Sequence, residues 1–519
     1  MSEAISQPLR IVLVADADQS LSDAQAQLIQ RLNDDPAIEL SSRLTGERKK
    51  GGRVLPLVLR GVLACERRLM RGRVQSYDTS AAREILAQLP EGDGQGSAIV
   101  CDLAIALGAR RLADNELGLL RYGEWALSFA GSDDPRWIGA APEVRAKPRI
   151  ELEILGRNAT NPDPAVIRST SYNPKPGAVL TGAFVAEKSV LFMHRALRDL
   201  VTERDVPLEE TSPVVWPRLP GTLETVSYAR SFLKTASHKL AEQVRTRRNR
   251  MRQYWRVSEG VGSVLDFEPR NARDLPVQAH VMADPFLFRS GENTWLFYEA
   301  MHAGGGKGWI EVAGLKDDGV EPSAVALKRP YHLSYPFVFS VGADIFMIPE
   351  TQESRRLEVW RATAFPLEWE LHATAFEGQL LAETSLYQDE NGQWWLLTNI
   401  SDHYAFQDHS SELYLFAVDG PDLKSITPHP RNPVVFGADR ARNGGAIIRY
   451  QDRVFRPAQN NSYGVYGYGL NLMEILRLDA TGYEERLVRE FTPNDKPGSI
   501  AMHHLSVAGD RYVLDWCGE

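Results

Sequence analysis

The fold is decided by Ala283-Asp-Pro-Phe-Leu-Phe288, which is followed by a turn at Ser290-Gly291 and then by Trp295-Leu-Phe-Tyr-Glu299. Two short runs of apolar and aromatic residues on either side of a Gly or Asp turn predict a β-hairpin. The same pattern recurs four more times, at intervals of about 50 to 60 residues. The further copies begin at Ser334, Glu383, Gly444 and His503.

This period suits one four-stranded blade per copy, so residues 255–519 are expected to form an all-β, five-bladed β-propeller. The alternative is a β-sandwich with coincidental hairpins, which five copies in the same register disfavour. Trp255-Arg-Val257 is expected to supply an outer strand to the last blade, because Trp516 leaves almost no chain after the final hairpin.

Length and composition set the broad class. The chain has 519 residues, 43% of them hydrophobic and 24% charged, which is typical of a globular protein of more than one domain. The formal charge of −9 argues against nucleic acid as a partner. Three scattered cysteines and a first apolar run too short for a signal segment predict a reducing compartment and a cytoplasmic protein.

Residues 1–204 alternate strand and helix signals and are expected to form an α/β domain with a Rossmann-type parallel sheet. The predicted strands are Ile11–Ala15 and the run Ser97-Ala-Ile-Val-Cys-Asp102, which precedes Leu103-Ala-Ile-Ala-Leu-Gly108. Leu21–Leu32 has helical spacing.

Residues 205–254 are expected to connect the two domains. Asp205–Gly221 is rich in proline and is interpreted as a linker, and Thr222–Arg252 is predicted to be one long helix. Between Arg230 and Arg252 this helix carries eight Lys or Arg and one acid, Glu242. The basic stretch is either a solvated face docked on an acidic neighbour or a contact with a membrane surface or polyanion.

Acidic residues recur where the chain enters the first strand or leaves the second strand of a copy, and both places are expected at one rim of the propeller. Paired carboxyl groups at an axial funnel suit cleavage or transfer of a glycosidic bond. Each acid alone is also explained by a strand-end turn or an interblade salt bridge. The candidate catalytic residues are Asp284, Glu383 as the general acid, and Glu350.

Other polar and aromatic residues near this rim are candidates for substrate binding. Arginines bind hydroxyl and acidic groups, and aromatic rings stack on sugars. The second histidine of His503-His504 is a candidate metal ligand, a substrate contact, or simply a hydrogen-bonded histidine. The binding candidates are His332, Tyr335, Glu299, Arg442, Arg456, Gln459 and Tyr463, and the metal candidate is His504.

The rear half resembles the five-bladed propellers of arabinanase- and xylosidase-type glycoside hydrolases. That resemblance implies one catalytic carboxylate in each of blades one to three and an axial histidine near a calcium ion; Asp284 and Glu383 match, and Tyr335 replaces the second acid. His332-Leu-Ser-Tyr-Pro-Phe-Val-Phe339 and Met347-Ile-Pro-Glu-Thr351 also resemble the N-terminal propeller module of plant glucosamine inositolphosphorylceramide transferases. Apart from that implied calcium ion, the sequence indicates no cofactor.

The front half resembles the formyltransferase-like fold. Cys101-Asp102 is expected to end a strand, and Tyr122-Gly-Glu-Trp-Ala-Leu-Ser128 stands in the position of the active loop. Active members use an Asn, His and Asp set, whereas this chain has no histidine between Asp102 and Lys188, and Ser171-Tyr-Asn-Pro-Lys175 stands where the aspartate is expected. A degenerate domain with a binding or scaffold role is the better interpretation.

Three functions follow from these observations. The leading hypothesis is a carbohydrate-active enzyme that hydrolyses or transfers a glycosyl group of a saccharide or glycolipid in the propeller funnel. The second is a formyl or acyl transferase acting on a sugar or sugar nucleotide in the front domain, with a glycan-binding propeller. The third is a non-catalytic binder of a glycan or lipid headgroup, with the basic helix at a membrane surface.

Overall fold

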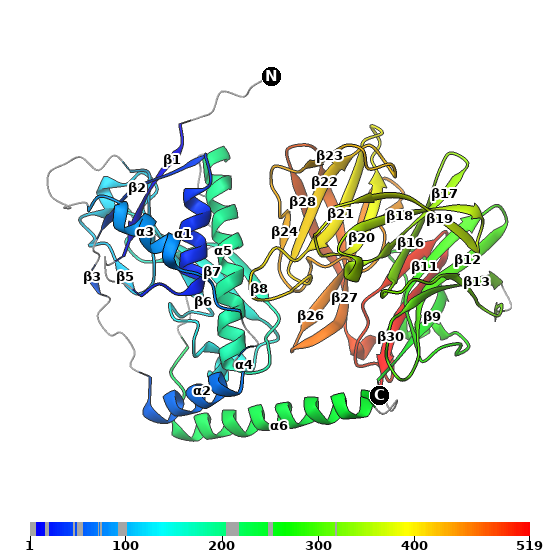
Figure 1. The fold of residues 1–519 in the computed structure, drawn as a ribbon, viewed down its shortest axis with the longest axis horizontal. Helices are drawn as coiled ribbons and strands as arrows, with labels where there is room; N and C mark the ends of the chain where they lie inside the picture. The colour runs from blue at the N-terminus through cyan, green and yellow to red at the C-terminus, as the bar shows by residue number, and fades with distance from the viewer. Residues whose placement is uncertain are drawn as a thin grey trace. The chain divides into compact units, whose positions relative to one another are not determined.

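A computed structural model describes residues 7–15, 20–44, 47–48, 55–70, 72, 75–91, 101–203, 217–247, 253–316 and 319–519. The chain forms two compact units, each described by itself (Figure 1). The first comprises Met1–Thr235 with His403–Gln407, and the second comprises Ala236–Asp402 with Asp408–Glu519. Most of the expected proline-rich linker lies outside the described residues. Among the helices described, none combines the length and the apolar character that crossing a membrane requires.

The first unit is built on a six-stranded mixed sheet in the order β2-β1-β4-β6-β7-β8. The first four of these strands run parallel, whereas β7 and β8 are antiparallel to their neighbours. The prediction of a parallel sheet is therefore wrong for β7 and β8. Between these two strands the chain is too short for the crossover that parallel strands need. The strands of this unit are β1 (Leu9–Val14), β2 (Ile38–Leu44), β3 (Glu47–Arg48), β4 (Leu103–Ala106), β5 (Arg110–Arg111), β6 (Glu124–Phe129), β7 (Ile150–Arg157) and β8 (Ala165–Tyr172).

One detail of the predicted front domain needs correction, and another lies outside the described residues. The run Ser97–Val100, which is expected to lead into Cys101-Asp102, is not among the described residues, and strand β4 begins directly after Cys101-Asp102, at Leu103. The expected active loop Tyr122–Ser128 is largely strand β6, because its backbone pairs with β4 on one side and β7 on the other. Formyltransferase-like chemistry therefore has no loop at this position.

Helices α1 and α5 pack against this sheet. The predicted helix Leu21–Leu32 is confirmed as α1, which begins with a capping box between Ser22 and Gln25. The predicted long helix is confirmed as α6 over its described part. On α5, the carboxylate of Glu187 accepts the backbone N–H groups of Tyr404 and Ala405, which lie in the five-residue segment that belongs to this unit. The helices are α1 (Asp23–Asn33), α2 (Leu57–Leu69), α3 (Ser80–Gln88), α4 (Pro142–Arg145), α5 (Ala178–Glu203) and α6 (Thr222–Arg247).

The second unit is a five-bladed β-propeller, as the repeat predicts. Five antiparallel sheets follow one another, and each begins with the first strand of one sequence copy. The last sheet is completed by strands from the start of the unit. The strands of blade one are β11 (Val281–Ser290), β12 (Asn293–Met301), β13 (Trp309–Lys316), β14 (Gly319–Val320) and β15 (Ala324–Leu327), and those of blade two are β16 (Ser334–Val341), β17 (Asp344–Glu350), β18 (Leu357–Ala364) and β19 (Glu368–Ala375). The strands of blade three are β20 (Leu381–Gln388), β21 (Trp394–Ile400), β22 (Glu412–Val418), β23 (Ile426–Pro428) and β24 (Val435–Phe436). The strands of blade four are β25 (Ile448–Tyr450), β26 (Arg453–Ser462), β27 (Val465–Leu478) and β28 (Tyr483–Phe491).

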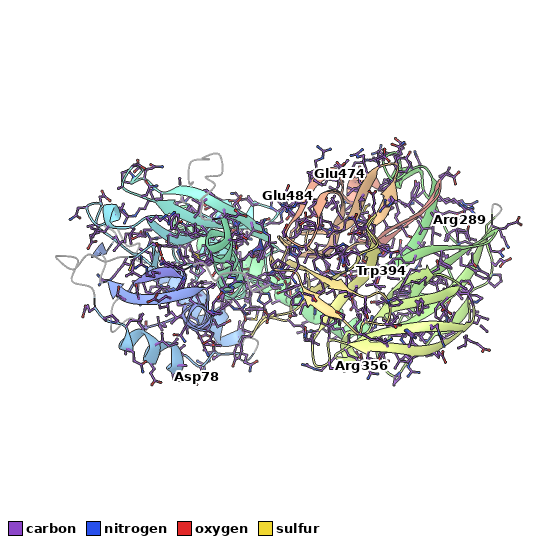
Figure 2. All side chains as sticks on the ribbon, turned by 90° about the horizontal axis from the view of Figure 1, so that it is seen from above. Asp78, Arg289, Arg356, Trp394, Glu474 and Glu484 are labelled. Carbon is purple, nitrogen blue, oxygen red and sulfur yellow. The ribbon has the colours of Figure 1, made fainter. Side chains whose placement is uncertain are left out.

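Closure of the propeller also follows the prediction. Blade five has the strand order β29-β30-β9-β10, with β29 (Leu505–Ala508) and β30 (Arg511–Gly518) from the chain's end and β9 (Tyr254–Val261) and β10 (Arg273–Asp274) from the unit's start. Trp255 pairs with Cys517, and Val257 pairs with Asp515. This arrangement leaves no blade incomplete, and charged side chains such as Arg289 and Glu484 lie at the propeller's surface (Figure 2).

The first strands of blades one to three share an irregularity. Their pairing register shifts between Ala283 and Phe286, and at the equivalent positions of β16 and β20. Within each shift one residue adopts a left-handed backbone conformation: Asp284 (φ 49°), Tyr335 (φ 46°) and Glu383 (φ 51°). Such strain in non-glycine residues is uncommon and clusters at functional sites. The three bulges mark where the site is built.

Candidate active site on the propeller axis

The bulged residues join neighbouring blades by hydrogen bonds. The backbone N–H of Asp284 donates to Oδ2 of Asp515 at 3.0 Å, and the backbone N–H of Tyr335 donates to Oδ2 of Asp284 at 3.2 Å. The backbone N–H of Glu383 donates to Oε2 of Glu350 at 3.3 Å. Every acceptor comes from the preceding blade, so the same contacts that hold the blades together also position these carboxyl groups.

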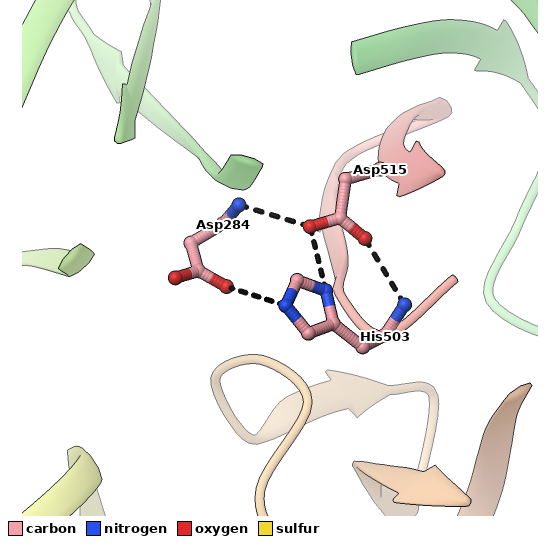
Figure 3. Close-up of side chains that lie close together, drawn as sticks. All are labelled: Asp284, His503 and Asp515. Carbon is pink, nitrogen blue, oxygen red and sulfur yellow. Dashed lines mark hydrogen bonds and ion pairs between the residues drawn. The ribbon is translucent and has the colours of Figure 1, made fainter. Parts of the chain in front are cut away.

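Asp284, His503 and Asp515 form one buried cluster (Figure 3). His503 Nδ1 lies 2.7 Å from Oδ2 of Asp515, and His503 Nε2 lies 3.7 Å from Oδ1 of Asp284. The other oxygen of Asp515 accepts the backbone N–H groups of His503 and His504 at 3.1 and 3.0 Å. One imidazole is thus placed between two carboxylates that come from different blades.

The opposite charges in this cluster shift the pKa of Asp284 and of His503 toward the charged form of each group. Burial alone would lower the pKa of His503, but the ion pair with Asp515 and the charge of Asp284 raise it to about 9. Burial alone would raise the pKa of Asp284, but the ring of His504 and the charges of His503 and Arg442 lower it to about 2. At neutral pH Asp284 is therefore an ionised carboxylate and His503 is an imidazolium.

His504 is fully buried beside this cluster. Its ring makes edge contacts with Phe286 and Tyr335, with centroids 4.5 and 5.2 Å apart, and its Nδ1 lies 3.6 Å from Oδ1 of Asp284. Neither ring nitrogen has a hydrogen-bond partner, nor does Oδ1 of Asp284. Buried polar atoms normally have partners, so these atoms leave hydrogen-bonding capacity for a bound polar group.

Glu383 is held from one side only. Arg442 donates to Oε1 of Glu383 from Nε at 3.1 Å and from Nη2 at 2.7 Å, and Nε2 of Gln459 donates to the same oxygen at 3.3 Å. Nη2 of Arg442 also lies 3.8 Å from Oε2 of Glu350. The second oxygen of Glu383, Oε2, is buried and has no hydrogen-bond partner.

Burial raises the pKa of Glu383 to about 8, and the charges of Asp284 and Glu350 add to this against the opposing effect of Arg442. The pKa of Glu350 is raised for the same reason, chiefly by burial. Because Oε1 already accepts three N–H groups, the proton that Glu383 carries at neutral pH belongs on Oε2. Glu383 is thus an acid with its proton on a free oxygen, while Asp284 is ionised.

Glu299 and His332 form a second pair at the same rim. Nε2 of His332 lies 3.3 Å from Oε1 of Glu299, and Nδ1 of His332 accepts the backbone N–H of Gly308 at 2.9 Å. Burial lowers the pKa of His332, so the neutral ring carries its proton on Nε2 and directs it toward Glu299. Burial also raises the pKa of Glu299 well above its ordinary value.

Aromatic rings border the polar cluster. Trp255 stacks on His503 with centroids 4.4 Å apart, and Tyr466 meets the same imidazole edge-on at 5.3 Å. The guanidinium of Arg442 lies 5.0 Å from the centroid of Tyr466. Tyr466 and Tyr463 lie on the hairpin between β26 and β27, and both are about half exposed. Exposed tyrosines beside buried acids suit the ring face of a sugar.

Comparison with known proteins identifies the family. The family described as "Glucosamine inositolphosphorylceramide transferase 1, N-terminal" matches residues 242–507, which is half of the chain. The chain belongs to this family. Its match thus runs from the end of α6 through the propeller and confirms the resemblance that the sequence motifs indicate.

Plant members of the glucosamine inositolphosphorylceramide transferase family are similar in sequence. Glucosamine inositolphosphorylceramide transferase 1 of Oryza sativa subsp. japonica is 34% identical over 237 residues, 44% of this chain and 31% of that protein. The protein of the same name from Arabidopsis thaliana is 31% identical over 268 residues, 49% of this chain and 34% of that protein. The match covers about a third of the length of these relatives.

Solved structures also match part of this chain, with low sequence identity. A xylan β-1,4-xylosidase from Bacillus halodurans C-125 has a TM-score of 0.35 and 13% identity, covering 46% of this chain and 49% of that one. An α-L-arabinanase of Cellvibrio cellulosa complexed with arabinohexaose has a TM-score of 0.32 and 15% identity, covering 45% of this chain and 85% of that one.

One predicted binding residue of this family member lies away from the others. Arg456 is fully buried and pairs with Glu485 through Nε at 2.9 Å and Nη2 at 2.7 Å, and its Nη1 donates to Asn443 at 3.2 Å. It does not contact the axial carboxyl groups. Of the other predicted residues, Asp284 lies beside His504, Glu383 is grouped with Glu350, Arg442 and Gln459, and Glu299 pairs with His332. Tyr335 contacts Asp284 and His504, and Tyr463 lies on the exposed hairpin.

Ligand atoms of Asp284, His503 and Asp515 lie close enough together for one cation to contact all three. Calcium prefers six to eight oxygen ligands. Both oxygens of Asp515 and Oδ2 of Asp284 already accept backbone N–H groups, which leaves one carboxylate oxygen and imidazole nitrogens. The described residues of this propeller therefore do not fit the calcium ion that the resemblance implies, and the candidate ligand His504 is not part of the group.

Three site residues of this propeller were not predicted from the sequence. The sequence predicts only a closing strand at Trp255, whereas in the structure the Trp255 ring stacks on His503. Asn443 donates from Nδ2 to the backbone oxygen of Glu383 at 2.8 Å and from its backbone N–H to Asn399 at 3.0 Å. Tyr466 is one of three tyrosines between residues 463 and 468, and that clustering was the available signal.

Proposed function

We propose that the propeller cleaves or transfers a glycosyl group at its axis, with Glu383 as general acid and Asp284 as base or nucleophile. The observation that carries this proposal is the opposite charge state of two buried carboxyl groups that lie close enough for the charge of Asp284 to raise the pKa of Glu383. The pKa of Asp284 is about 2 and that of Glu383 is about 8. Reaction at a glycosidic bond uses one protonated and one ionised carboxyl group.

The proposed chemistry assigns a task to each group. The proton on Oε2 of Glu383 passes to the glycosidic oxygen as its bond to the anomeric carbon breaks, and the electron pair of that bond stays on the oxygen. Asp284 either takes a proton from the incoming water or hydroxyl group or attacks the anomeric carbon itself. Arg442 orients Glu383, and Glu350 keeps the pKa of Glu383 high.

The proposed substrate class is a saccharide or glycolipid. The names of the plant relatives refer to glucosamine and inositolphosphorylceramide, which combine an amino sugar with an inositol phosphate lipid. Half-exposed Tyr466, whose ring contacts His503 and Arg442, provides a face for stacking on a sugar ring beside the axial acids. The match covers about a third of the length of those relatives, so assigning their substrate class to this chain is part of the proposal.

Two other functions stay predictions. A propeller that binds a glycan without turnover would use the same cluster, and kinetics separate that case from catalysis. The second is formyl or acyl transfer by the first unit, which has the mixed sheet of an α/β domain. The first unit lacks the histidine that active formyltransferases have in their active loop.

The proposal is tested by substituting each carboxyl group by its amide. Purified Asp284→Asn and Glu383→Gln proteins are assayed with 4-nitrophenyl glycosides of glucosamine, xylose and arabinofuranose and with glucosaminyl inositolphosphorylceramide. Asp344→Asn and Glu368→Gln make the same changes at exposed positions of the propeller and serve as matched controls. We expect turnover to fall by about 100-fold or more in both axial variants and to be unchanged in the controls. If the wild-type protein binds these glycans without turning them over, the propeller is a glycan-binding module and not an enzyme.

A further inference from the structure

Helix α6 carries a row of exposed apolar side chains that the proposed function does not use. Spacings of three, seven, seven and four residues place these side chains on one helix face. Tyr228 and Phe232, which are buried, lie on a different face. The exposed row, here called the apolar stripe, consists of Leu223, Val226, Leu233, Leu240 and Val244, which are 39–85% exposed.

Basic side chains form a parallel row at one edge of the apolar stripe. Arg230, Lys234 and His238 are spaced four residues apart and are exposed, and Arg245 follows seven residues later. The acidic residues of α6 are Glu224 and Glu242, which lie five turns apart on the face opposite the stripe. Arg245 pairs with Glu242 at 3.1 Å, so the positive charge at the border of the apolar stripe comes from Arg230 and Lys234.

We propose that α6 lies in the surface of an anionic lipid bilayer. The apolar stripe enters the boundary between headgroups and acyl chains, and Arg230 and Lys234 extend their charged ends to the lipid headgroups. Each basic residue near an anionic bilayer adds attraction that salt weakens. This inference concerns where the protein binds and is independent of the chemistry proposed for the propeller axis.

A second copy of the chain fits the apolar stripe less well. In a heptad pattern, Val226, Leu233 and Leu240 occupy one seam position, but the other seam position holds Leu223, Arg230, Ser237 and Val244. A parallel pair of helices would bring the two Arg230 charges together inside the seam, where apolar residues are needed. A lipid surface accepts the same arginine, because its long side chain reaches water.

Vesicle flotation with the full chain tests the inference. Vesicles of phosphatidylcholine with phosphatidylserine are expected to bind the protein, and vesicles of phosphatidylcholine alone are expected to bind it at least about tenfold more weakly. Binding to the anionic vesicles should fall as salt is raised. The double variant Leu233→Gln/Leu240→Gln and the double variant Arg230→Gln/Lys234→Gln should each weaken binding by about tenfold or more.

The matched control is Leu371→Gln/Leu487→Gln, which changes two comparably exposed leucines on β19 and β28 and should leave vesicle binding unchanged. Circular dichroism checks that each variant keeps its helix content. If Leu233→Gln/Leu240→Gln unfolds, vesicle binding by Arg230→Gln/Lys234→Gln decides the result. Equal binding to both kinds of vesicle, binding insensitive to both α6 variants, or no binding would overturn the inference. A dimer that depends on the same leucines, without vesicle binding, would assign the stripe to a second copy.

Discussion

Arg442 donates from two nitrogens to a single oxygen of Glu383, at 3.1 and 2.7 Å, and leaves the other oxygen without a partner. The carboxyl group is therefore oriented through Oε1 and free to give up a proton from Oε2. Around it lie four further buried or nearly buried carboxyl groups, Asp284, Glu299, Glu350 and Asp515, against two firmly charged cations, Arg442 and His503. This excess of acids explains why some of them hold protons at neutral pH.

The charge states predict the pH dependence of catalysis. Glu383 must be protonated, and its pKa is about 8, so kcat/KM should fall tenfold per pH unit above about pH 8. Asp284 must be ionised, and its pKa of about 2 leaves the rate flat from about pH 4 to 7. Initial rates from about pH 4 to about pH 10 check both the flat region and the decline. A rate that declines below pH 5 with an ordinary carboxyl pKa would contradict the assignment of Asp284.

The stability of the propeller should also depend on pH through His503. Its pKa is raised from 6.5 to about 9 in the folded state, so its stabilising effect is complete below pH 6.5 and is lost as pH rises through about 9. The expected loss is about 3 kcal/mol in the free energy of unfolding. Glu383 also loses its proton in this range, so the loss due to His503 is measured as the difference between wild-type protein and His503→Gln in chemical denaturation at pH 6 and pH 9. His503→Gln should reduce the difference between the two pH values, and an unchanged difference would exclude His503 as its source.

Arg456 should matter for folding rather than for substrate. Its guanidinium is fully buried against Glu485, so Arg456→Met leaves an unpaired buried carboxylate and should cost about 3–5 kcal/mol of unfolding free energy. The double variant Arg456→Met/Glu485→Met should recover most of that loss. Urea denaturation gives both values. If Arg456→Met keeps its stability and instead raises KM, Arg456 contacts substrate after all.

A buried tyrosine secures α6 to the first unit. The hydroxyl of Tyr228 donates to Oε2 of Glu66 on α2 and accepts the backbone N–H of Ala178 at 2.6 Å, at the start of α5. Tyr228→Phe leaves both groups buried without this partner and should cost about 1–3 kcal/mol in the unfolding of the first unit. The exposed Tyr463→Phe serves as the control and should cost nothing measurable in urea denaturation.

The propeller was predictable because its signals are local. Each hairpin carries its own turn, so the repeat predicts equivalent positions for Asp284, Tyr335 and Glu383, and the structure gives all three the same bulge. The short chain after the last hairpin predicts closure through Trp255, which pairs with Cys517. The sequence could place carboxyl groups at the rim because the rule for strand ends holds in every blade.

Other features depend on partners distant in the chain. Arg456 and Glu485 pair across the sheet, and no pattern near either residue indicates that contact. Strand β7 alternates buried and half-buried residues in its first half, which predicts a strand but not its direction, so the antiparallel end of the first sheet was missed. The charge states of Asp284 and Glu383 depend on burial and on Arg442, which only the assembled blades define.

The dependence of rate on the leaving group tests the role of Glu383 most directly. A series of aryl glycosides with leaving groups of increasing pKa is assayed with wild-type protein and with Glu383→Gln. If Glu383 gives its proton to the leaving oxygen, the variant should retain most of the rate with the most acidic leaving group and lose about 100-fold or more with the least acidic one. A loss that is the same for every leaving group would contradict general acid catalysis by Glu383.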